Sequence, residues 1–429
     1  MKLNYRKTFL LGFGFFGVSI IWGVYNAFVP VFLAKKFALD ITWISFFMTL
    51  DNIAALLIQP PIGAWSDRLR TPIGRRMPFI LIGAPIGAVV FGIIPLAGAL
   101  PLFFACATTL LLSMAFWRTP VVALMPDITP SAYRSQANGI INFMGGVGAI
   151  LSFLVGASLY EMNPAYPFWM GSILVIAAVV LVFIFIKEPK KYEGSEERPS
   201  MTKSLMEVLR DKDKSAIRIF LAIFFWFLGY TAIEALFNLY AINHLGISEA
   251  NGGRMLGELS LIFVLFALPA GYIGSRFGRR RTIIAGILIM SAILLVIFLL
   301  PVATLLQPLF PLPFIGITAV VEGKSVLVVM GALMMIAGAG WALININSLP
   351  MVVDMTENVR IGTYTGLYYL FSTLSAIVGP ISNGWLIKMT GDNYNSMMIA
   401  APVCMVVAFL LMLGVRRGEA RPESLSAAD

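Results

Sequence analysis

Charged residues are scarce in this chain, and so are the residue types on which most enzyme sites depend. Asp, Glu, Lys and Arg together make up 12% of the 429 residues, about half of the charge fraction of an ordinary soluble domain. One histidine and two cysteines provide neither a metal-binding cluster nor a nucleophile beside a histidine. A glycine-rich nucleotide-binding loop is also missing from the sequence. These features argue against an enzyme and against a pump driven directly by ATP.

Hydrophobic residues are abundant instead, at 59% of the chain. Apolar runs of about 20 residues recur throughout, which is enough for a helix to cross the hydrocarbon core of a bilayer. Backbone groups in that core must pair within a helix or a closed barrel, and these runs lack the alternation of barrel strands. The composition therefore predicts an all-α polytopic membrane protein. Cys106 and Cys404 both fall inside apolar runs, where we expect small core residues.

The apolar runs divide into twelve predicted spans. They cover approximately residues 9–33, 42–64, 78–98, 100–124, 138–160, 166–187, 218–243, 253–274, 281–302, 326–350, 362–387 and 396–415. The stretch 303–325 is also apolar, but it contains several prolines, so we expect a long outer loop there.

Basic residues are unevenly distributed among the segments between these spans. Most of the 31 Lys and Arg lie in the segments that share a side with the N-terminus. Because cytoplasmic loops carry an excess of Lys and Arg, this bias places both termini in the cytoplasm. It also explains the net charge of +9 without a nucleic-acid partner.

A polar, charge-rich segment separates the chain into halves. Residues 188–217 form this segment, which we interpret as a cytoplasmic linker. Six spans precede it in residues 1–187, and six follow it in residues 218–429. Each half is therefore expected to form one helical bundle.

The two halves carry related charged loops. GAWSDRLRTPIGRRMPF, from Gly63 to Phe79, follows the second span, and GYIGSRFGRRR, from Gly271 to Arg281, follows the eighth. The repeat predicts two pseudo-symmetric six-helix bundles, as in transporters built from parallel repeats that bind substrate near the midplane between the halves. Other pairs brought together by the alignment are Asp67 with Ser275, Asn26 with Glu234, Arg118 with Asn345, and Asp127 with Asp354.

The first of these loops carries a family resemblance. Major facilitator superfamily transporters have a G-x-x-x-D-R-x-G-R-[RK] pattern after the second span, and this loop resembles it, with an insertion at residues 70–73. MPFILIG after the loop, LLIQPPIGAWSDR in span two and SQANGIINFMGGVGAI in span five resemble the sucrose and glycoside symporters of that superfamily, including glycoside-pentoside-hexuronide:cation symporters. The residues that fit the loop pattern are Gly63, Asp67, Arg68, Gly74, Arg75 and Arg76.

The resemblance implies the major facilitator fold and secondary active transport by alternating access. It implies import of a glycoside, such as a di- or oligosaccharide, coupled to protons, with sodium left open as the coupling ion. We expect a monomer in a bacterial inner membrane, without a metal or organic cofactor. Asp51 departs from the pattern of the plant sucrose carriers, in which span two has no acid, so coupling residues of relatives do not transfer directly.

The first charged loop has two interpretations. In the first, its arginines only fix the orientation of the chain in the membrane. In the second, its residues form a cytoplasmic gate. A carboxylate such as Asp67 at the end of a span accepts strong hydrogen bonds from arginines, and contacts that break and re-form would shift the populations of two conformations. We favour the gate, made of the six loop residues named above together with Asp127 and Asp354.

Ionisable residues at membrane depth cost several kcal/mol and are functional candidates. Asp51, Arg118 and Glu234 are the candidate proton-coupling residues. An acid that alternately pairs with Arg118 or binds a proton would couple the two fluxes, whereas a fixed ion pair between helices is the alternative. Glu258 lies nearer the outer end of its span and is expected to reach water, and His244 is expected at the surface of an outer loop.

Sugar recognition requires amides, hydroxyls and carboxylates, with aromatic faces against the ring. A single aromatic residue in a membrane helix is more often a packing residue, so only a cluster would count. The glycines of span five, Gly145, Gly146 and Gly148, are expected to allow close helix packing. The candidate substrate-binding residues are Tyr25, Asn26, Arg118, Asn142, Tyr230, Glu234, Asn238, Asn345, Asn347, Tyr364 and Tyr368.

Two other functions compete with sugar import. One is export of a drug or metabolite in exchange for protons. Span five lacks the glycine-proline pair that is typical of such exporters, which favours symport, and Gly379-Pro380 is such a pair in span eleven. The other is a membrane receptor without transport, which would usually carry a larger soluble output domain than this sequence provides.

Overall fold

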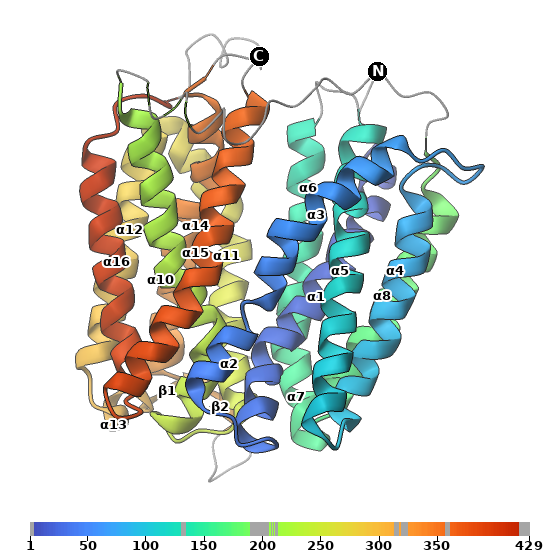
Figure 1. Cartoon of the computed structure of the whole chain (residues 1–429). Helices are drawn as coiled ribbons and strands as arrows, with labels where there is room; N and C mark the ends of the chain where they lie inside the picture. Colours follow the sequence, from blue (N-terminus) through green and yellow to red (C-terminus); the bar gives the residue numbers. More distant parts are fainter. Residues whose placement is uncertain are drawn as a thin grey trace. The chain divides into compact units, whose positions relative to one another are not determined.

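The computed structural model describes residues 4–129, 134–188, 206, 208, 210, 213–312, 317–318, 325–356 and 361–419. Within these residues, 12 helices are long and apolar enough to cross a membrane, and each overlaps one of the spans expected from the sequence. The twelve-helix prediction is therefore confirmed (Figure 1). Most of the predicted linker, including its expected surface helix, lies outside the described residues.

Long helices make up the N-terminal half of the chain, and several spans are built from two or three consecutive segments. The second span combines α2 and α3, and the fifth combines α6, a π-helical segment and α7. The bounds are α1 Tyr5–Lys35, α2 Ile41–Phe47, α3 Leu50–Arg68, α4 Met77–Ile93, η1 Ile94–Leu96, α5 Leu100–Ile128, α6 Arg134–Ile150, η3 Leu151–Val155, α7 Gly156–Met162 and α8 Tyr166–Phe185.

The C-terminal half repeats the pattern of six long helices and adds a small sheet. Its helices are α10 Ser215–Asn243, α11 Glu249–Phe277, α12 Arg279–Leu299, α13 Val302–Leu305, α14 Val329–Val353, α15 Ile361–Met389 and α16 Ser396–Leu413. Its strands are β1 Pro308–Pro311, β2 Ile317–Thr318 and β3 Ser325–Val328.

The expected outer loop between spans nine and ten contains this sheet. The strands form an antiparallel sheet in the order β1-β3-β2, with Phe310 opposite Leu327 and Ile317 opposite Val326. Leu327 is buried, so β3 also contributes to the core of this half. Proline at a strand end lacks only a hydrogen bond that an edge strand can spare, which explains why a proline-rich stretch still pairs.

The contacts divide the chain into two compact units. The N-terminal unit holds Met1–Gly194 and Ile247–Gly257, and the C-terminal unit holds Ser195–Gly246 and Glu258–Asp429. The start of α11 thus packs within the N-terminal unit. Two ion pairs hold it there, one between Lys35 and Glu249 and one between Arg254 and Glu161, whose hydrogen bonds measure 2.7 and 2.8 Å.

Glycines set the close approach of α1 and α6 in the N-terminal unit. A methyl group added at Gly148 would lie 2.6 Å from the backbone oxygen of Phe16, which is too close for any side chain. Ser152, in the π-helical segment, donates a hydrogen bond of 3.0 Å to the backbone oxygen of Ile20. The close packing expected from the glycines of span five is therefore confirmed at Gly148.

Close backbone approach also joins α11 and α14 in the C-terminal unit. A methyl group added at Gly338 would overlap the backbone oxygen of Leu259. Further along the same pair of helices, the Asn347 amide donates to the backbone oxygen of Ala270 at 3.1 Å, and a methyl group at Gly274 would overlap the Asn347 side chain. Hydrogen bonds of this kind fasten membrane helices where no hydrophobic force acts between them.

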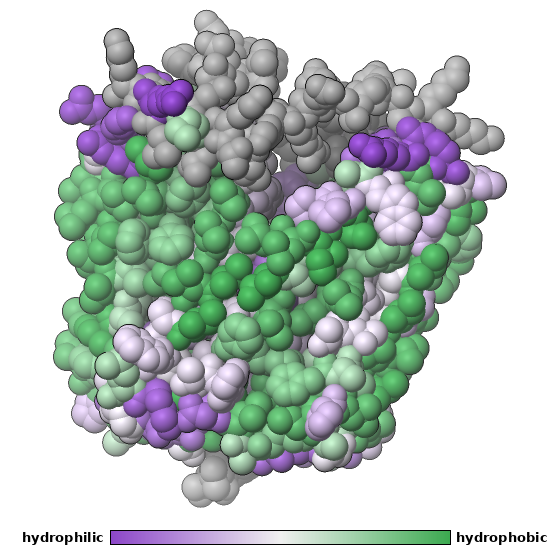
Figure 2. Space-filling view, viewed as in Figure 1, coloured by the Kyte–Doolittle hydropathy of each residue, from purple (hydrophilic) through white to green (hydrophobic). Residues whose placement is uncertain are grey.

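The outer surface of the helices is apolar. Figure 2 shows hydrophobic side chains over the middle of the helices and hydrophilic ones towards their two ends. Large apolar residues such as Leu57, Ile173 and Leu268 are exposed, and Leu268 reaches 83% exposure. Such a surface is unfavourable in water and suits the hydrocarbon core of a bilayer.

Candidate functional site

The start of α4 is capped by an acid from the other end of the N-terminal half. The carboxylate of Glu188, just after α8, accepts hydrogen bonds from the backbone N–H groups of Arg75, Arg76 and Met77 at 2.9, 3.0 and 2.7 Å. These N–H groups have no partner within the helix, and the helix dipole favours an anion there. Gly74, with φ of 115°, makes the turn before the helix, and a side chain at Gly74 would overlap Glu188.

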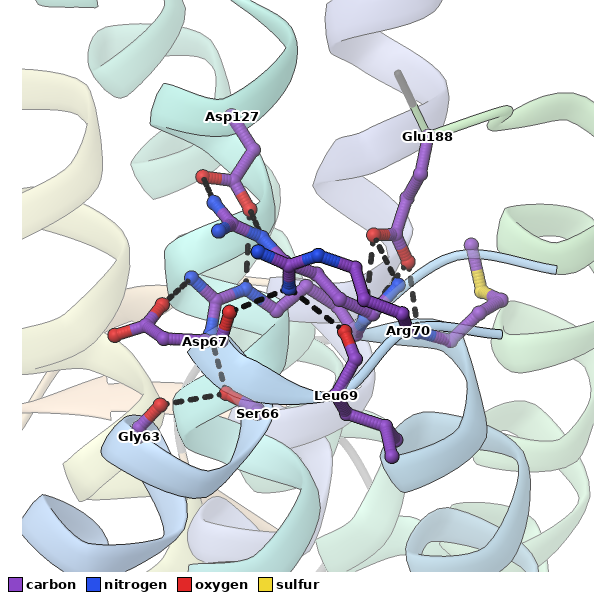
Figure 3. A network of polar contacts seen from close by, with 10 residues as sticks. Gly63, Ser66, Asp67, Leu69, Arg70, Asp127 and Glu188 are labelled. Carbon is purple, nitrogen blue, oxygen red and sulfur yellow. Dashed lines mark hydrogen bonds and ion pairs between the residues drawn. The ribbon is translucent and has the colours of Figure 1, made fainter. Parts of the chain in front are cut away.

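Two arginines beside this cap connect three helices (Figure 3). Arg75 donates from Nε and Nη2 to the two carboxylate oxygens of Asp127 on α5, at 3.2 and 2.6 Å. Arg76 donates to Asp127 at 3.0 Å and also to Asp67 and Ser66 at the end of α3. Arg76 is only 4% exposed, so these bonds are shielded from water. We call Ser66, Asp67, Arg75, Arg76, Asp127 and Glu188 the N-terminal charged network.

Arg70, the first of the residues inserted in the loop, bonds back to the end of α3. Arg70 donates from Nη1 to the backbone oxygens of Asp67 and Leu69, at 2.6 and 2.8 Å. Gly63 belongs to the network through its backbone, because its oxygen accepts a 2.9 Å hydrogen bond from Ser66. Arg68, another residue of the predicted gate, is exposed. The structure thus brings the carboxylates of Asp67 and Asp127 together with Arg75 and Arg76, whereas Arg68 lies at the surface.

A related arrangement caps α12 in the C-terminal unit. Glu419, after α16, accepts hydrogen bonds from the backbone N–H groups of Arg279 and Arg280 at 2.7 and 3.1 Å. Gly278, with φ of 95°, makes the preceding turn, and the Arg279 side chain pairs with Asp354. Asp354 therefore belongs to this C-terminal charged network of Arg279, Arg280, Asp354 and Glu419. Within the described residues, the structure thus assigns the residues of the predicted gate to two networks, one in each unit.

The second arginine of each loop has a different partner. Arg280 donates to the backbone oxygens of Met412 and Leu413 at the end of α16, at 3.1 and 2.7 Å. Ser275, which aligns with Asp67, donates to the backbone oxygen of Tyr272 in its own helix at 2.8 Å. The two loops are therefore unequal, because Arg76 reaches a carboxylate on α3 and Arg280 reaches helix carbonyls on α16.

One acid lies within electrostatic range of two other candidate residues inside the N-terminal unit. Asp51 on α3 interacts electrostatically with Arg118 on α5 and with Tyr25 on α1. Asn52 donates a 2.8 Å hydrogen bond to the Asp51 carboxylate. Trp22 packs edge-on against Tyr25, with ring centroids 5.6 Å apart. Charged and hydroxyl groups from three spans therefore share one region at membrane depth.

The two asparagine candidates of this unit have different positions. Asn26 is half-buried on α1, next to Tyr25 in the chain. Asn142 is exposed on α6, and its amide donates a 2.8 Å hydrogen bond to the backbone oxygen of Asn138. The structure thus leaves Asn26 half-buried on α1, whereas the Asn142 amide bonds to its own helix.

An aromatic cluster lies inside the C-terminal unit. Tyr230 on α10 stacks on Trp341 of α14, with ring centroids 3.8 Å apart and planes within 6°. Phe227 contacts both Trp341 and Tyr368 edge-on, and the Tyr368 hydroxyl lies 3.0 Å from Ser348 Oγ. The sequence analysis predicted Tyr230 and Tyr368 but missed Trp341. Trp341 stands one helical turn before the candidate Asn345 on α14, and this spacing was the signal that could have identified it.

Other candidates of this unit surround the cluster or support the helices. Glu234, half-buried and one turn after Tyr230 on α10, interacts with it electrostatically. Asn345 is half-buried one turn after Trp341. The Asn347 amide donates its hydrogen bond to the backbone of α11. Asn238 is fully buried, and the ring of Tyr364 packs against Phe220 with centroids 5.8 Å apart.

Glu258 does not reach water, contrary to the expectation from its place near the end of the span. The whole residue is 1% exposed, and a methyl group added at Gly331 on α14 would overlap its carboxylate. His244 follows the end of α10, where it is half-buried beside Tyr240, and burial lowers the pKa of this histidine. No group of three or more His, Cys, Asp or Glu within the described ranges could hold a metal ion.

The described part of the chain has twelve apolar helices, a charged loop repeated in each half and ionisable groups at membrane depth, and these features define a helical membrane transport protein. The sequence model described as the Major Facilitator Superfamily matches residues 11–323 and 260–428. The chain therefore belongs to the Major Facilitator Superfamily. It is a transporter and not an enzyme.

Relatives and solved structures agree with this family. Multidrug resistance protein 2 of Bacillus subtilis (strain 168) is 26% identical over 275 residues, which cover 63% of this chain and 66% of that protein. Sucrose transport protein SUC3 of Arabidopsis thaliana is 25% identical over 164 residues, which cover 33% of this chain and 27% of that protein. The chain thus spans less than two thirds of the length of either relative.

The fold also matches a crystal structure of a bacterial homolog of the human lysosomal transporter Spinster, in an inward-facing and occupied conformation. The TM-score is 0.74, with 14% sequence identity, over 98% of this chain and 100% of that one. At this identity the likeness shows the fold alone.

Proposed function

We propose that this transporter imports a glycoside together with protons. The observation that carries the proposal is the electrostatic interaction of Asp51 with Arg118 and with Tyr25 inside the N-terminal unit. A carboxylate at membrane depth beside an arginine can exchange its partner for a proton, and substrate hydroxyls can then bind the released guanidinium. Proton and substrate would in this way depend on the same pair of side chains.

The aromatic cluster of the C-terminal unit supports a sugar as substrate. Sugars present an apolar ring face and a rim of hydroxyls, which match an aromatic surface next to hydroxyl and carboxylate groups. Tyr230 and Trp341 supply the rings, and Glu234 stands one turn from Tyr230. The similarity to a protein named as a sucrose transport protein favours the same substrate class.

The N-terminal charged network would act as the gate on the cytoplasmic side. Its bonds between Arg76, Asp67 and Asp127 join the ends of α3, α4 and α5, so they must form in one conformation and weaken in another to affect transport. A difference of about 1.4 kcal/mol between the two conformations changes their ratio tenfold. We place this end of the helices in the cytoplasm, in the inner membrane of a bacterium, and expect a monomer.

Uptake into vesicles tests the proposed function. The purified chain is reconstituted and supplied with radiolabelled sucrose and maltose under an imposed proton gradient, an imposed sodium gradient or neither. Proton-dependent accumulation that Asp51→Asn abolishes supports the proposal. Sugar exchange without a gradient should survive in that variant, which shows that it is folded. Absence of sugar uptake by the wild type under every gradient refutes sugar import, and uptake driven only by sodium refutes the coupling ion.

The runner-up is export of a drug or metabolite in exchange for protons. The similarity to Multidrug resistance protein 2 over 275 residues is the observation that favours it. Vesicles preloaded with a cationic dye separate the two functions. Proton-driven loss of dye, without any sugar dependence, identifies the exporter.

A further inference from the structure

The small sheet of the C-terminal unit exposes large apolar side chains. Leu309 and Phe310 of β1 are 49% and 52% exposed, and the prolines at both ends of the strand are exposed as well. The sequence from residue 299 to residue 312 contains no Asp, Glu, Lys, Arg or His. Such a surface is unfavourable in water and indicates contact with an apolar partner.

The sheet lies at the end of the spans that is opposite the C-terminal charged network (Figure 1). α12 begins beside that network at Arg279 and ends at Leu299, and its 21 residues extend about 30 Å, the thickness of the hydrocarbon core. The backbone oxygen of Gln307, just before β1, accepts a 3.1 Å hydrogen bond from the N–H of Val329, the first residue of α14. Phe310 is three residues further along, at most about 10 Å from that level. Because the headgroup region is about 5–8 Å thick on each side, β1 lies within it or beside it.

The apolar surface of β1 continues the one that the bilayer covers on α12. Leu299 is 67% exposed at the end of this span, and Pro301 and Ala303 are also exposed on the way to β1. On the other side of the sheet, Leu327 and Val328 of β3 are buried. The sheet is thus held to the helices through β3, and its outer strand β1 is available to a partner.

The edge of β1 is unsuited to pairing with a further strand. Pro308 and Pro311 carry no N–H, so two of the four residues of β1 have no donor. The register of β1 on β3 shifts between Pro308 and Phe310, which makes Leu309 a bulge. Prolines and bulges keep edge strands from pairing with another chain, whereas lipid needs no strand partner. At headgroup depth the carbonyls of this edge can still bind water, which they could not do in the hydrocarbon core.

We propose that β1, through Leu309 and Phe310, binds the boundary between the headgroups and the acyl chains of the bilayer. The partner is the lipid surface itself and not one particular headgroup, because the stretch 299–312 offers no charge to an anionic or a cationic group. Since β3 continues directly into α14 at Val329, this contact ties the end of a span to the membrane surface. The inference is independent of the transported substrate and of the coupling ion.

Quenching of a fluorescent label by lipid tests the contact. Cys106→Ser and Cys404→Ser remove both cysteines, and Phe310→Cys then accepts a nitrobenzoxadiazole maleimide, whose emission depends on polarity. The labelled full chain is placed in phosphatidylcholine vesicles with nitroxide lipids that carry the spin label near the headgroup end of the acyl chain. These lipids should quench the label strongly, iodide on both sides of the membrane should quench it weakly, and its emission should lie at a shorter wavelength than that of the free dye in water.

Asn393→Cys in the same background is the matched control. Asn393 is exposed in the polar loop between α15 and α16. This loop lies at the same end of the unit, because Asn395 donates a 3.1 Å hydrogen bond to the backbone oxygen of Phe298 near the end of α12. Its label should be quenched strongly by iodide and weakly by the nitroxide lipids. A label at residue 310 that behaves like the label at residue 393 overturns the proposal.

Two further outcomes identify other partners of β1. Protection of the label at residue 310 from both quenchers, with cross-linking of Phe310→Cys between two chains by a short bis-maleimide, shows that a second copy covers the strand and overturns the proposal. Lipid quenching that appears only in phosphatidylglycerol vesicles shows recognition of an anionic headgroup and overturns it as well. If Phe310→Cys does not fold, Leu309→Cys takes its place with the same expected result, and strong iodide quenching with weak lipid quenching of that label overturns the proposal.

Discussion

Replacement of Glu188 by alanine should destabilise the N-terminal unit in a way that the two free cysteines can report. The change removes three hydrogen bonds from backbone N–H groups at the start of α4. Loss of a helix cap costs about 0.5–2 kcal/mol, and three bonds to a charged acceptor place this variant near 2 kcal/mol. The corresponding cap, Glu419, accepts two such bonds and is exposed, so Glu419→Ala should cost about 1 kcal/mol or less.

A thiol-reactive dye can follow the two units separately. Cys106 is buried on α5 and Cys404 is half-buried on α16, and both are free. With Cys404→Ser as background, labelling on heating reports the N-terminal unit through Cys106, and with Cys106→Ser it reports the C-terminal unit through Cys404. Glu188→Ala should lower the midpoint seen through Cys106 more than Glu419→Ala lowers the midpoint seen through Cys404.

Glu188→Gln provides the matched control for charge. It keeps an acceptor oxygen but loses the negative charge at the helix start, so its loss of stability should fall between wild type and Glu188→Ala. If Glu188→Ala unfolds at the wild-type temperature, the cap does not stabilise α4 and the reasoning from these bonds is refuted.

Three further predictions concern Asp67, Gly148 and His244. Asp67→Asn should slow sucrose uptake about tenfold at unchanged expression, because a change of about 1.4 kcal/mol between conformations is enough for that factor, and unchanged uptake would argue against the gate. Gly148→Val should reduce the amount of folded protein on gel filtration, because its side chain would meet the backbone of Phe16, and a normal yield would refute the close contact. Burial lowers the pKa of His244, so stability contributed by the neutral ring is present above about pH 6.5 and lost as the pH falls below it. His244→Gln should therefore show a smaller loss of thermal stability in mild acid than the wild type does.

The spans could be predicted because they depend on local composition alone. An apolar run long enough to cross a bilayer must be helical in a membrane, whatever its neighbours are. The sheet formed by β1, β2 and β3 could not be predicted in the same way. Its strands are two to four residues long and rich in proline, and they pair only because Phe310 and Ile317 meet residues of β3.

Part of the candidate site could be predicted because the two halves of the sequence align with each other. The alignment of the two halves identified Asp67, Asp127 and Asp354, which all have arginine partners in the structure. Glu188 and Glu419 were missed because each is distant in sequence from the helix it caps. Their common position, shortly after the last helix of each half, was the signal that could have revealed them.

The exposure of Glu258 was misjudged for a different reason. Distance from the end of a span says how deep a residue lies along the helix, but it does not say which side of the helix faces another helix. Gly331 and Gly338 on α14 decide this, because they let α11 approach until its side chains are enclosed. Only the pairing of two helices, which sequence spacing does not specify, separates a buried acid from a hydrated one.

The two charged networks differ in what they hold. In the N-terminal unit Arg76 ties the end of α3, through Asp67, to α4 and α5. In the C-terminal unit the equivalent end of α11 bonds within itself, since Ser275 and Arg276 both bond to Tyr272. Within this unit, α11 is fastened to α14 by close packing at Gly338 and by the hydrogen bond from Asn347, neither of which involves a charged group. An ion pair can be broken by water or a competing ion, whereas a close-packed contact is lost only when the helices separate.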